Sequence, residues 1–216
     1  HEAPLARAEA GLPESAFGFV CFNNHRKIRR ENFDAWMRLL AAVPGSVLWL
    51  LDDSANDQLR EHARARGIDP GRLIFAPKVD VPVHLRRLPC ADLMLDTLPY
   101  GAHTTASDAL WMGVPIVTCL GTAFAGRVAA SLLTAIQCPE LITHSMTEYE
   151  ALALELARDG ARLQALRRKV TANRLTTPLF DAERFRRHIE QAYVTMMEIA
   201  RAGEAPRPFD VPVLTP

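Results

Sequence analysis

Residues 91–120 read ADLMLDTLPYGAHTTASDALWMGVPIVTCL, and this stretch decides the fold. Its two ends, ADLMLDT and PIVTCL, are short apolar runs typical of buried strands. Between them, Thr104–Met112 has the apolar spacing of a helix, and Gly113 follows as a residue that ends helices. Two apolar strands joined by a helix indicate a parallel strand–helix–strand unit with both faces covered.

The same alternation extends outward in both directions. Further strands are predicted for FGFVCFN at 17–23, SVLWLLD at 46–52 and RLIFAP at 72–77, with a short one at 141–143. Helices are predicted for residues 30–43, 57–66, 83–88, 124–136, 146–158, 160–173 and 182–202. Because strands alternate with helices and crossovers are right-handed, the predicted fold class is α/β, a doubly wound parallel (Rossmann-like) sheet.

The chain divides into four predicted parts. Residues 1–16 lack periodicity and are expected to be a linker, or a tail lying on another domain. Residues 17–178 form the Rossmann-like lobe, residues 179–203 a C-terminal helix, and the proline-rich residues 204–216 an extended tail.

Composition narrows the class of protein. The 216 residues carry 25 Lys and Arg against 25 Asp and Glu, so a dedicated nucleic-acid binder is disfavoured. No apolar run approaches the length needed to span a bilayer, and the start lacks the apolar run of a signal peptide. The four cysteines form no close pair and are expected to be buried in a reducing compartment, so we expect a cytoplasmic location.

The candidate chemistry lies in the loops after the strands, because ligands bind outside the carboxyl ends of such sheets. Asn23–Lys27 follows the first strand and matches neither the dinucleotide fingerprint nor the P-loop. Lys27, one of only three lysines, could hold a phosphate as a point charge; a solvated turn is the alternative. His84 and Arg87 share one face of a short helix and could bind a flat base, unless that helix is ordinary surface.

The sharpest candidate is the loop from Asp96 to Asp108. It delivers Thr104 and Thr105 to a helix start, where free amides and hydroxyls favour an anion. Asp108, one turn in, could accept hydrogen bonds from ribose. The alternative is plain capping, with Thr104 as the N-cap. A second Gly/Thr turn leads to Arg127, which could also face a ligand.

One basic segment keeps another class of protein open. Residues 162–188 hold eight Lys or Arg and two acidic residues, a net charge of +6. Such a patch could contact nucleic acid or an acidic partner, but few aromatic residues interleave it, and a solvated helix face is favoured.

Together these segments resemble a known family. The chain is similar to the C-terminal catalytic lobe of the O-linked N-acetylglucosamine transferases, including their bacterial homologues. The matching stretches are FVCFNNHRKI, VPGSVLWLLD, RLIFAP, HLRR, ADLMLDT, GAHTTASDALWMGVPIVT and RVAASLLTAIQCPELI, in order over residues 17–200. The resemblance implies one lobe of a two-lobed GT-B glycosyltransferase, which holds the nucleotide and needs no metal. The high arginine-to-lysine ratio also favours a bacterial source.

The resemblance implies a role for each residue of the phosphate region. Lys27 would contact the diphosphate and stabilise the departing UDP. Asn24 stands where the family often has glutamine, and would make a shorter contact to the diphosphate. His103, Thr104 and Thr105 would hold the phosphates.

The nucleoside region follows in the same way. His84 would pack on uracil, Arg87 would reach its edge, and the backbone near Val79 would also read the base. Asp108 would hold the ribose. Val81 stands where animal members have a ribose-contacting lysine, so that contact is expected to be missing.

The implied activity is inverting transfer of N-acetylglucosamine from UDP-GlcNAc to Ser or Thr hydroxyls of proteins. The residues supply no general base, so the resemblance assigns acceptor binding to an N-terminal lobe and a tetratricopeptide domain, with the C-terminal helix packing back toward that lobe. This chain would then be the donor-binding half, unable to transfer sugar alone. The alternatives are a GDP-fucose-dependent protein O-fucosyltransferase, disfavoured by His103, and a non-catalytic UDP-binding module.

Overall fold

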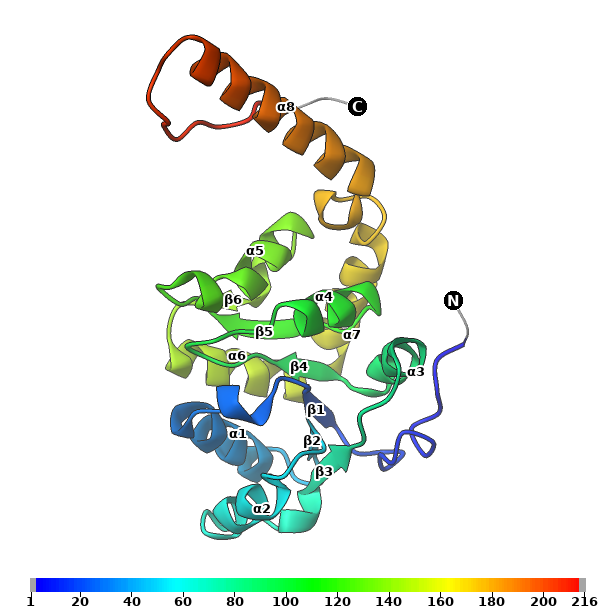
Figure 1. Ribbon diagram of the computed structural model, residues 1–216. Coiled ribbons are helices and arrows are strands. Elements are labelled where there is room, and N and C mark those ends of the chain that lie inside the picture. The colour runs from blue at the N-terminus through cyan, green and yellow to red at the C-terminus, as the bar shows by residue number, and fades with distance from the viewer. Residues whose placement is uncertain (1–2, 214–216) are drawn as a thin grey trace.

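The computed structural model describes residues 3–213 and contains one six-stranded sheet in the order β3-β2-β1-β4-β5-β6 (Figure 1). All neighbouring strands are parallel. The strands are β1 (Gly18–Cys21), β2 (Val47–Leu51), β3 (Leu73–Ala76), β4 (Leu93–Leu95), β5 (Ile116–Cys119) and β6 (Ile142–Thr143). The order reverses between β1 and β4, so the predicted doubly wound α/β fold is confirmed.

Helices follow the strands along the chain. They are α1 (Arg30–Ala42), α2 (Asn56–Arg64), α3 (Val81–Arg87), α4 (Thr104–Trp111), α5 (Val128–Ala135), α6 (Met146–Arg158), α7 (Gly160–Asn173) and α8 (Ala182–Arg201). Short 3-10 turns link several of them. Pairs of helices that are distant in sequence pack together, notably α1 with α6 and α4 with α7.

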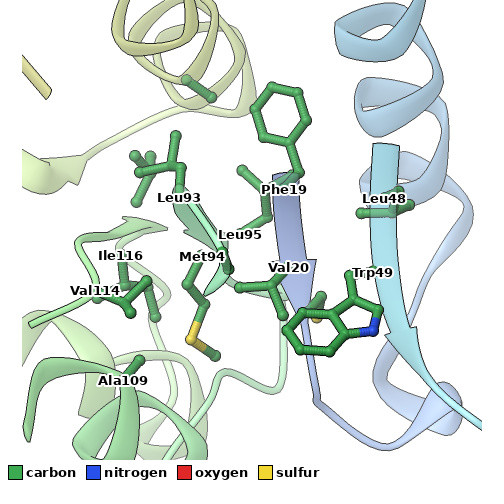
Figure 2. Close-up of a cluster of buried hydrophobic side chains, with 14 of the residues drawn as sticks. Phe19, Val20, Leu48, Trp49, Leu93, Met94, Leu95, Ala109, Val114 and Ile116 are labelled. Carbon is green, nitrogen blue, oxygen red and sulfur yellow. The ribbon is translucent and has the colours of Figure 1, made fainter. Parts of the chain in front are cut away.

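The core runs through the middle of the sheet. Val20 of β1 lies opposite Trp49 on one side and Met94 on the other, and all three side chains are buried. Figure 2 shows Phe19 and Val20 pointing to opposite faces, as successive strand residues must. Both faces therefore bury apolar side chains, which explains why these strands read as continuous apolar runs.

One predicted helix is broken. The pattern over 124–136 predicted a single helix, but the chain forms a 3-10 turn at Phe124–Gly126 and then α5. The cause is a close approach: a Cβ on Gly126 would lie 2.8 Å from the Pro99 carbonyl oxygen and 3.2 Å from Gly121. Contact with the neighbouring loop thus overrides the local helical pattern.

The N-terminal segment packs on this lobe rather than standing apart from it. Leu12 is only 3% exposed, and the Leu5 amide donates to the Arg86 carbonyl at 3.1 Å. Arg7 pairs with Asp92 at the amino end of β4, with 3.2 Å between Nη1 and Oδ2. The expectation that this segment lies on another domain is therefore corrected for residues 3–16; residues 1–2 lie outside the described residues.

The C-terminal part leaves the sheet. Helix α8 extends away from the other layers (Figure 1), and Ile199 is its only buried residue among those described. Apolar side chains on α8 are exposed, among them Phe185, Tyr193 and Met197. Residues 204–213 form no helix or strand, as the proline-rich composition predicted, and residues 214–216 lie outside the described range.

Two predictions from composition can be compared with the structure. All four cysteines are buried and unpaired, as expected. Within residues 3–213, no helix is both long enough and apolar enough to cross a membrane.

Candidate functional site

The predicted site residues gather at the carboxyl edge of the sheet, around the point where the strand order reverses. Lys27 ends the 3-10 turn His25–Lys27 that follows β1, and His103 precedes α4 after β4. His84 lies on α3, which follows β3. This edge is where doubly wound sheets bind their ligands.

Lys27 reaches across to the loop after β4. Its Nζ donates to the Gly101 carbonyl oxygen at 3.0 Å and lies 4.0 Å from the centroid of the Tyr100 ring. Burial lowers the pKa of Lys27, and the charge of Asp96 opposes that shift. The ammonium is thus partly dehydrated and positioned above the loop, an arrangement suited to binding an anion.

Asn24 plays a local role in the same turn. Its side-chain Oδ1 accepts a hydrogen bond from the Arg26 amide at 3.0 Å and caps the 3-10 turn. The residue is exposed beside Lys27, where both line a pocket of about 310 Å³ together with Tyr100. The turn therefore uses the carbonyl side of the Asn24 amide for its own structure.

The start of α4 differs from plain capping. Thr104 is the first helical residue and not the N-cap, and His103 occupies the cap position without a side-chain cap hydrogen bond. The Thr105 hydroxyl donates to Asn23 Oδ1 at 2.7 Å, whereas Thr104 is exposed. The first helical amides therefore lack a side-chain cap and can receive an anion.

His103 joins the loops after β4 and β5. Its ring stacks on Tyr100 with 5.2 Å between centroids, and its Nε2 lies 3.2 Å from the Ala125 carbonyl oxygen. The same carbonyl accepts from the Gly101 amide at 2.8 Å. Because a carbonyl only accepts, Nε2 carries the proton in this contact. Phe124 faces the edge of the ring at 6.1 Å.

His84 and Arg87 lie together, but Arg87 is placed deeper than predicted. Arg87 is 4% exposed, and its Nη1 donates to the Pro77 carbonyl oxygen at 2.7 Å. Its guanidinium lies 4.6 Å from the Phe22 ring centroid, and Nη2 lies 3.1 Å from His84 Nδ1. Arg87 is thus a buried hydrogen-bond partner that holds the His84 ring in place.

His84 also connects the predicted base and ribose residues. Its Nε2 lies 3.8 Å from Asp108 Oδ2. Burial lowers the pKa of His84, and the charge of Arg87 lowers it further. Burial raises the pKa of Asp108. The structure therefore brings His84 and Asp108 to one place, with a neutral ring available for stacking.

The loop after β3 leaves its side chains in solvent. Val79 in this loop and Val81, the first residue of α3, are both exposed, Val81 to 67%. Lys78 points toward the end of β2, where its Nζ lies 3.9 Å from Asp53 Oδ2. Arg127 is likewise exposed, and its Nη1 donates to the Gly121 carbonyl at 3.3 Å. In this structure, therefore, Lys78 pairs with Asp53 and Arg127 with its own loop, and neither is paired with the loop that holds Lys27.

Sequence reasoning missed three residues of this edge: Asn23, Asp96 and Tyr100. The sequence places Asp96 and Tyr100 in the candidate loop and Asn23 in the segment after the first strand, but it gives none of the three a role. The available signal was position, because Asp96 directly follows β4 and Asn23 lies two residues after β1, the two strands on either side of the reversal. Tyr100 is an exposed aromatic residue in the same loop.

Other features of the surface lie elsewhere. A groove of about 910 Å³ runs along α5 and β6 and is lined by Phe124, Ile142 and the candidate residue Arg127, but not by the candidate residues around Lys27, His84 and His103. In the basic segment, several cations are paired with acids, including Arg167 with Asp92 and Lys169 with Glu140. Within residues 3–213, no group of three or more His, Cys, Asp or Glu side chains is arranged to hold a metal ion.

Comparison with known proteins defines first the class and then the family. The six-stranded parallel sheet with flanking helices matches lobes of GT-B glycosyltransferases. A lipopolysaccharide glycosyltransferase, WaaG, shares this fold at 17% identity and a TM-score of 0.62, over 81% of this chain and 47% of its own. The family model for glycosyl transferase family 41 matches residues 4–189, and the chain belongs to that family.

Two relatives within the family are similar in sequence. A probable UDP-N-acetylglucosamine–peptide N-acetylglucosaminyltransferase of Arabidopsis thaliana, SEC, is 39% identical over 95% of this chain. A mutant O-GlcNAc transferase of Thermobaculum terrenum has a solved structure with a TM-score of 0.77 at 34% identity, over 88% of this chain. The chain spans 21% of the first protein and 38% of the second, so it corresponds to a part of each.

Proposed function

We propose that this chain is the nucleotide-sugar-binding lobe of an inverting glycosyltransferase that moves N-acetylglucosamine from UDP-GlcNAc to Ser or Thr hydroxyls of proteins. Family membership and the peptide N-acetylglucosaminyltransferases among its relatives support the donor and the acceptor. The observation that carries the proposal is the placement of Lys27 against the loop that leads into α4, at the β1/β4 reversal.

The chemistry of the proposed reaction matches these groups. When the sugar leaves the donor, negative charge builds on the departing diphosphate. The Lys27 ammonium, the first amides of α4 and the hydroxyl of Thr104 provide positive charge and hydrogen-bond donors for it, which is electrostatic stabilisation of the transition state. In the proposed reaction these protein groups do this work without a metal ion.

The nucleoside has a proposed place beside the phosphates. The neutral His84 ring would stack on uracil, and the Asp108 carboxylate would accept hydrogen bonds from ribose hydroxyls. Arg87 would hold His84 in place, and the backbone near Val79 would contact the edge of the base. Asn24 would add an amide donor to the diphosphate.

The acceptor side lies outside this set of residues. We propose that an N-terminal lobe and a tetratricopeptide domain of the same enzyme bind the protein acceptor and supply the general base. The exposed apolar side chains of α8, such as Tyr193 and Met197, fit a helix that packs against that lobe.

The test is calorimetric titration of the chain with UDP and with GDP. We expect UDP to bind more tightly, and Lys27→Ala to weaken UDP binding by about 10- to 100-fold, since a hydrogen bond to a charged group is lost. Lys27→Arg should retain part of the affinity. Lys169→Ala, which removes a lysine paired with Glu140 outside the site, is the matched control and should bind as the wild type does.

Each other result favours a different function. A preference for GDP would favour the fucosyltransferase alternative. Equal UDP binding by the wild type and Lys27→Ala would contradict the assigned phosphate site. Normal UDP binding without sugar transfer by the longer enzyme would favour a non-catalytic UDP-binding module.

A further inference from the structure

A buried carboxylate is hydrogen-bonded to the loop that forms part of the candidate phosphate site. Asp96 ends β4 and is 3% exposed. Its Oδ1 accepts hydrogen bonds from the amides of Thr97 at 2.7 Å and Ala102 at 2.6 Å, and from Asn23 Nδ2 at 3.5 Å. Its Oδ2 accepts from the Thr118 hydroxyl at 2.7 Å. One side chain thus joins the ends of β1, β4 and β5.

The hydrogen bonds donated by the Thr97 and Ala102 amides fold the loop 97–102 around this carboxylate. The loop is closed further by the Thr97 hydroxyl, which donates to the Tyr100 carbonyl at 2.7 Å. Space inside is tight, because a Cβ on Gly101 would lie 3.1 Å from Asp96 Oδ2. Gly101 is also the residue whose carbonyl oxygen holds the Lys27 ammonium. The carboxylate therefore determines where the partner of Lys27 lies.

A second connection runs from Asp96 to the start of α4. Asn23 donates to the Thr97 hydroxyl at 2.8 Å and accepts from the Thr105 hydroxyl at 2.7 Å. The Asn23 amide is buried, so its orientation is fixed by these partners. Through Asn23, the same network sets the position of the first turn of α4.

The energetic cost of this arrangement indicates that it has a purpose beyond packing. Burial raises the pKa of Asp96, because a carboxylate loses its hydration there, while its hydrogen bonds act in the opposite direction. An apolar residue would avoid that cost but would leave the amides of Thr97 and Ala102 without acceptors. A carboxylate has enough acceptor sites for every donor that converges here.

We propose that Asp96 is a positioning residue of the diphosphate site: it holds the loop 97–102 and, through Asn23, the start of α4, so that Lys27 and the first amides of α4 are placed for the diphosphate. This inference rests on the proposed function. Asp96 itself does not contact the donor.

The test compares Asp96→Asn with Asp96→Ala in the 216-residue chain. Asparagine can accept from the two amides and donate to the Thr118 hydroxyl, so UDP affinity should stay within about threefold of the wild type. Alanine leaves two buried amides without acceptors, and UDP affinity should fall at least about tenfold. Hydrogen exchange of the Thr97 and Ala102 amides should accelerate in Asp96→Ala and stay slow in Asp96→Asn.

Two further variants separate positioning from general stability. Asp92→Asn changes the carboxylate at the opposite end of β4, where it pairs with Arg7; it should lower stability without changing UDP affinity. Asn23→Ala leaves Asp96 intact but removes the bridge to Thr105. It should weaken UDP binding several-fold, and it decides the question if Asp96→Ala fails to fold.

The outcomes are distinct. Wild-type UDP affinity in folded Asp96→Ala, equal losses in the alanine and asparagine variants, or unchanged affinity in Asn23→Ala would each overturn the positioning role alone. Failure of the wild-type chain to bind UDP would overturn the proposed function itself, and this inference with it.

Discussion

At the scale of single residues, the site is built from contacts between positions far apart in the sequence. Lys27 donates a hydrogen bond to Gly101, and Thr105 donates one to Asn23. Each contact joins the segment after β1 to the segment after β4, its neighbour in the sheet, although two strands and three helices separate them along the chain. A substitution in one loop therefore acts on the other, and effects of paired changes at these contacts should not add.

His84 gives a prediction about pH. The guanidinium of Arg87 can only donate, so His84 Nδ1 must keep its lone pair, and protonation of the ring would break this hydrogen bond. Burial lowers the pKa of His84 below its ordinary value of 6.5, and Arg87 adds to the shift. The unfolded chain therefore takes up a proton at a higher pH than the folded chain, and acidification below about 6.5 costs stability.

Measurement of the free energy of unfolding by urea at several pH values between 7 and 5 checks this effect. Relative to His84→Asn, the wild type should lose up to about 1.4 kcal/mol for each unit by which the pKa is lowered. Asparagine keeps an acceptor for Arg87 but does not titrate in this range. Taking the difference between the two proteins removes groups that do not contact His84, including Asp96, whose raised pKa acts in the opposite direction. Parallel curves would contradict the lowered pKa.

At the scale of elements, helices and strands were predicted correctly where the local sequence pattern and the tertiary environment favour the same structure. The strands were predicted because a parallel sheet buries both faces and leaves a continuous apolar run. Helices α6 and α7 have the predicted ends, since Ser145 and Asp159 cap their first turns through side-chain hydrogen bonds to amides three residues on. In these cases a local signal in the sequence determines the boundary.

Prediction failed where a contact between loops decides the structure. Gly126 lies against Pro99, and this approach, invisible in a helical pattern, delays the start of the predicted helix 124–136 to Val128. In the candidate site too, local pattern predicted some features, and contacts between loops decided others. The segments after β1 and β4 that carry Lys27 and Thr105 could be identified from strand order, but the Asp96 network could not, because its donors come from three separate strand ends.

Helix α6 gives a prediction about the attachment of a helix to the sheet. The buried Tyr149 hydroxyl donates to the Asp96 carbonyl oxygen at 2.9 Å and accepts from Trp36 Nε1 at 3.1 Å. Tyr149→Phe keeps the ring but leaves the Trp36 donor buried without its partner. We expect the free energy of unfolding to fall by about 1 to 3 kcal/mol in urea denaturation. Tyr193→Phe, on the exposed face of α8, should have little effect; equal values for both variants would contradict the role of the hydroxyl.

At the scale of the whole molecule, the two terminal segments differ in how they relate to the sheet and its covering helices. The N-terminal segment is anchored at several points, including the Cys90 thiol, which donates to the Leu5 carbonyl at 3.2 Å, and the Arg7 guanidinium, which donates to the Ala16 carbonyl. It lies beside Arg86 of α3, the helix that carries His84. In contrast, α8 exposes apolar side chains on a helix that extends away from the sheet. One end of the chain is therefore integrated into the lobe, and the other presents a surface for packing.

Leu12 tests whether the N-terminal segment folds as part of the lobe. Its side chain is buried with the main core, so Leu12→Ala removes apolar contacts and leaves a cavity. The loss should be about 2 to 3 kcal/mol in the free energy of unfolding, as for other buried leucines. Leu175→Ala, at a leucine that is 76% exposed, is the matched control and should change stability by less than about 0.5 kcal/mol. Urea denaturation followed by far-UV circular dichroism measures both. If the two variants unfold at the same urea concentration, the segment is a separate tail; if only Leu12→Ala unfolds earlier, residues 3–16 move and fold with the lobe that carries the candidate site.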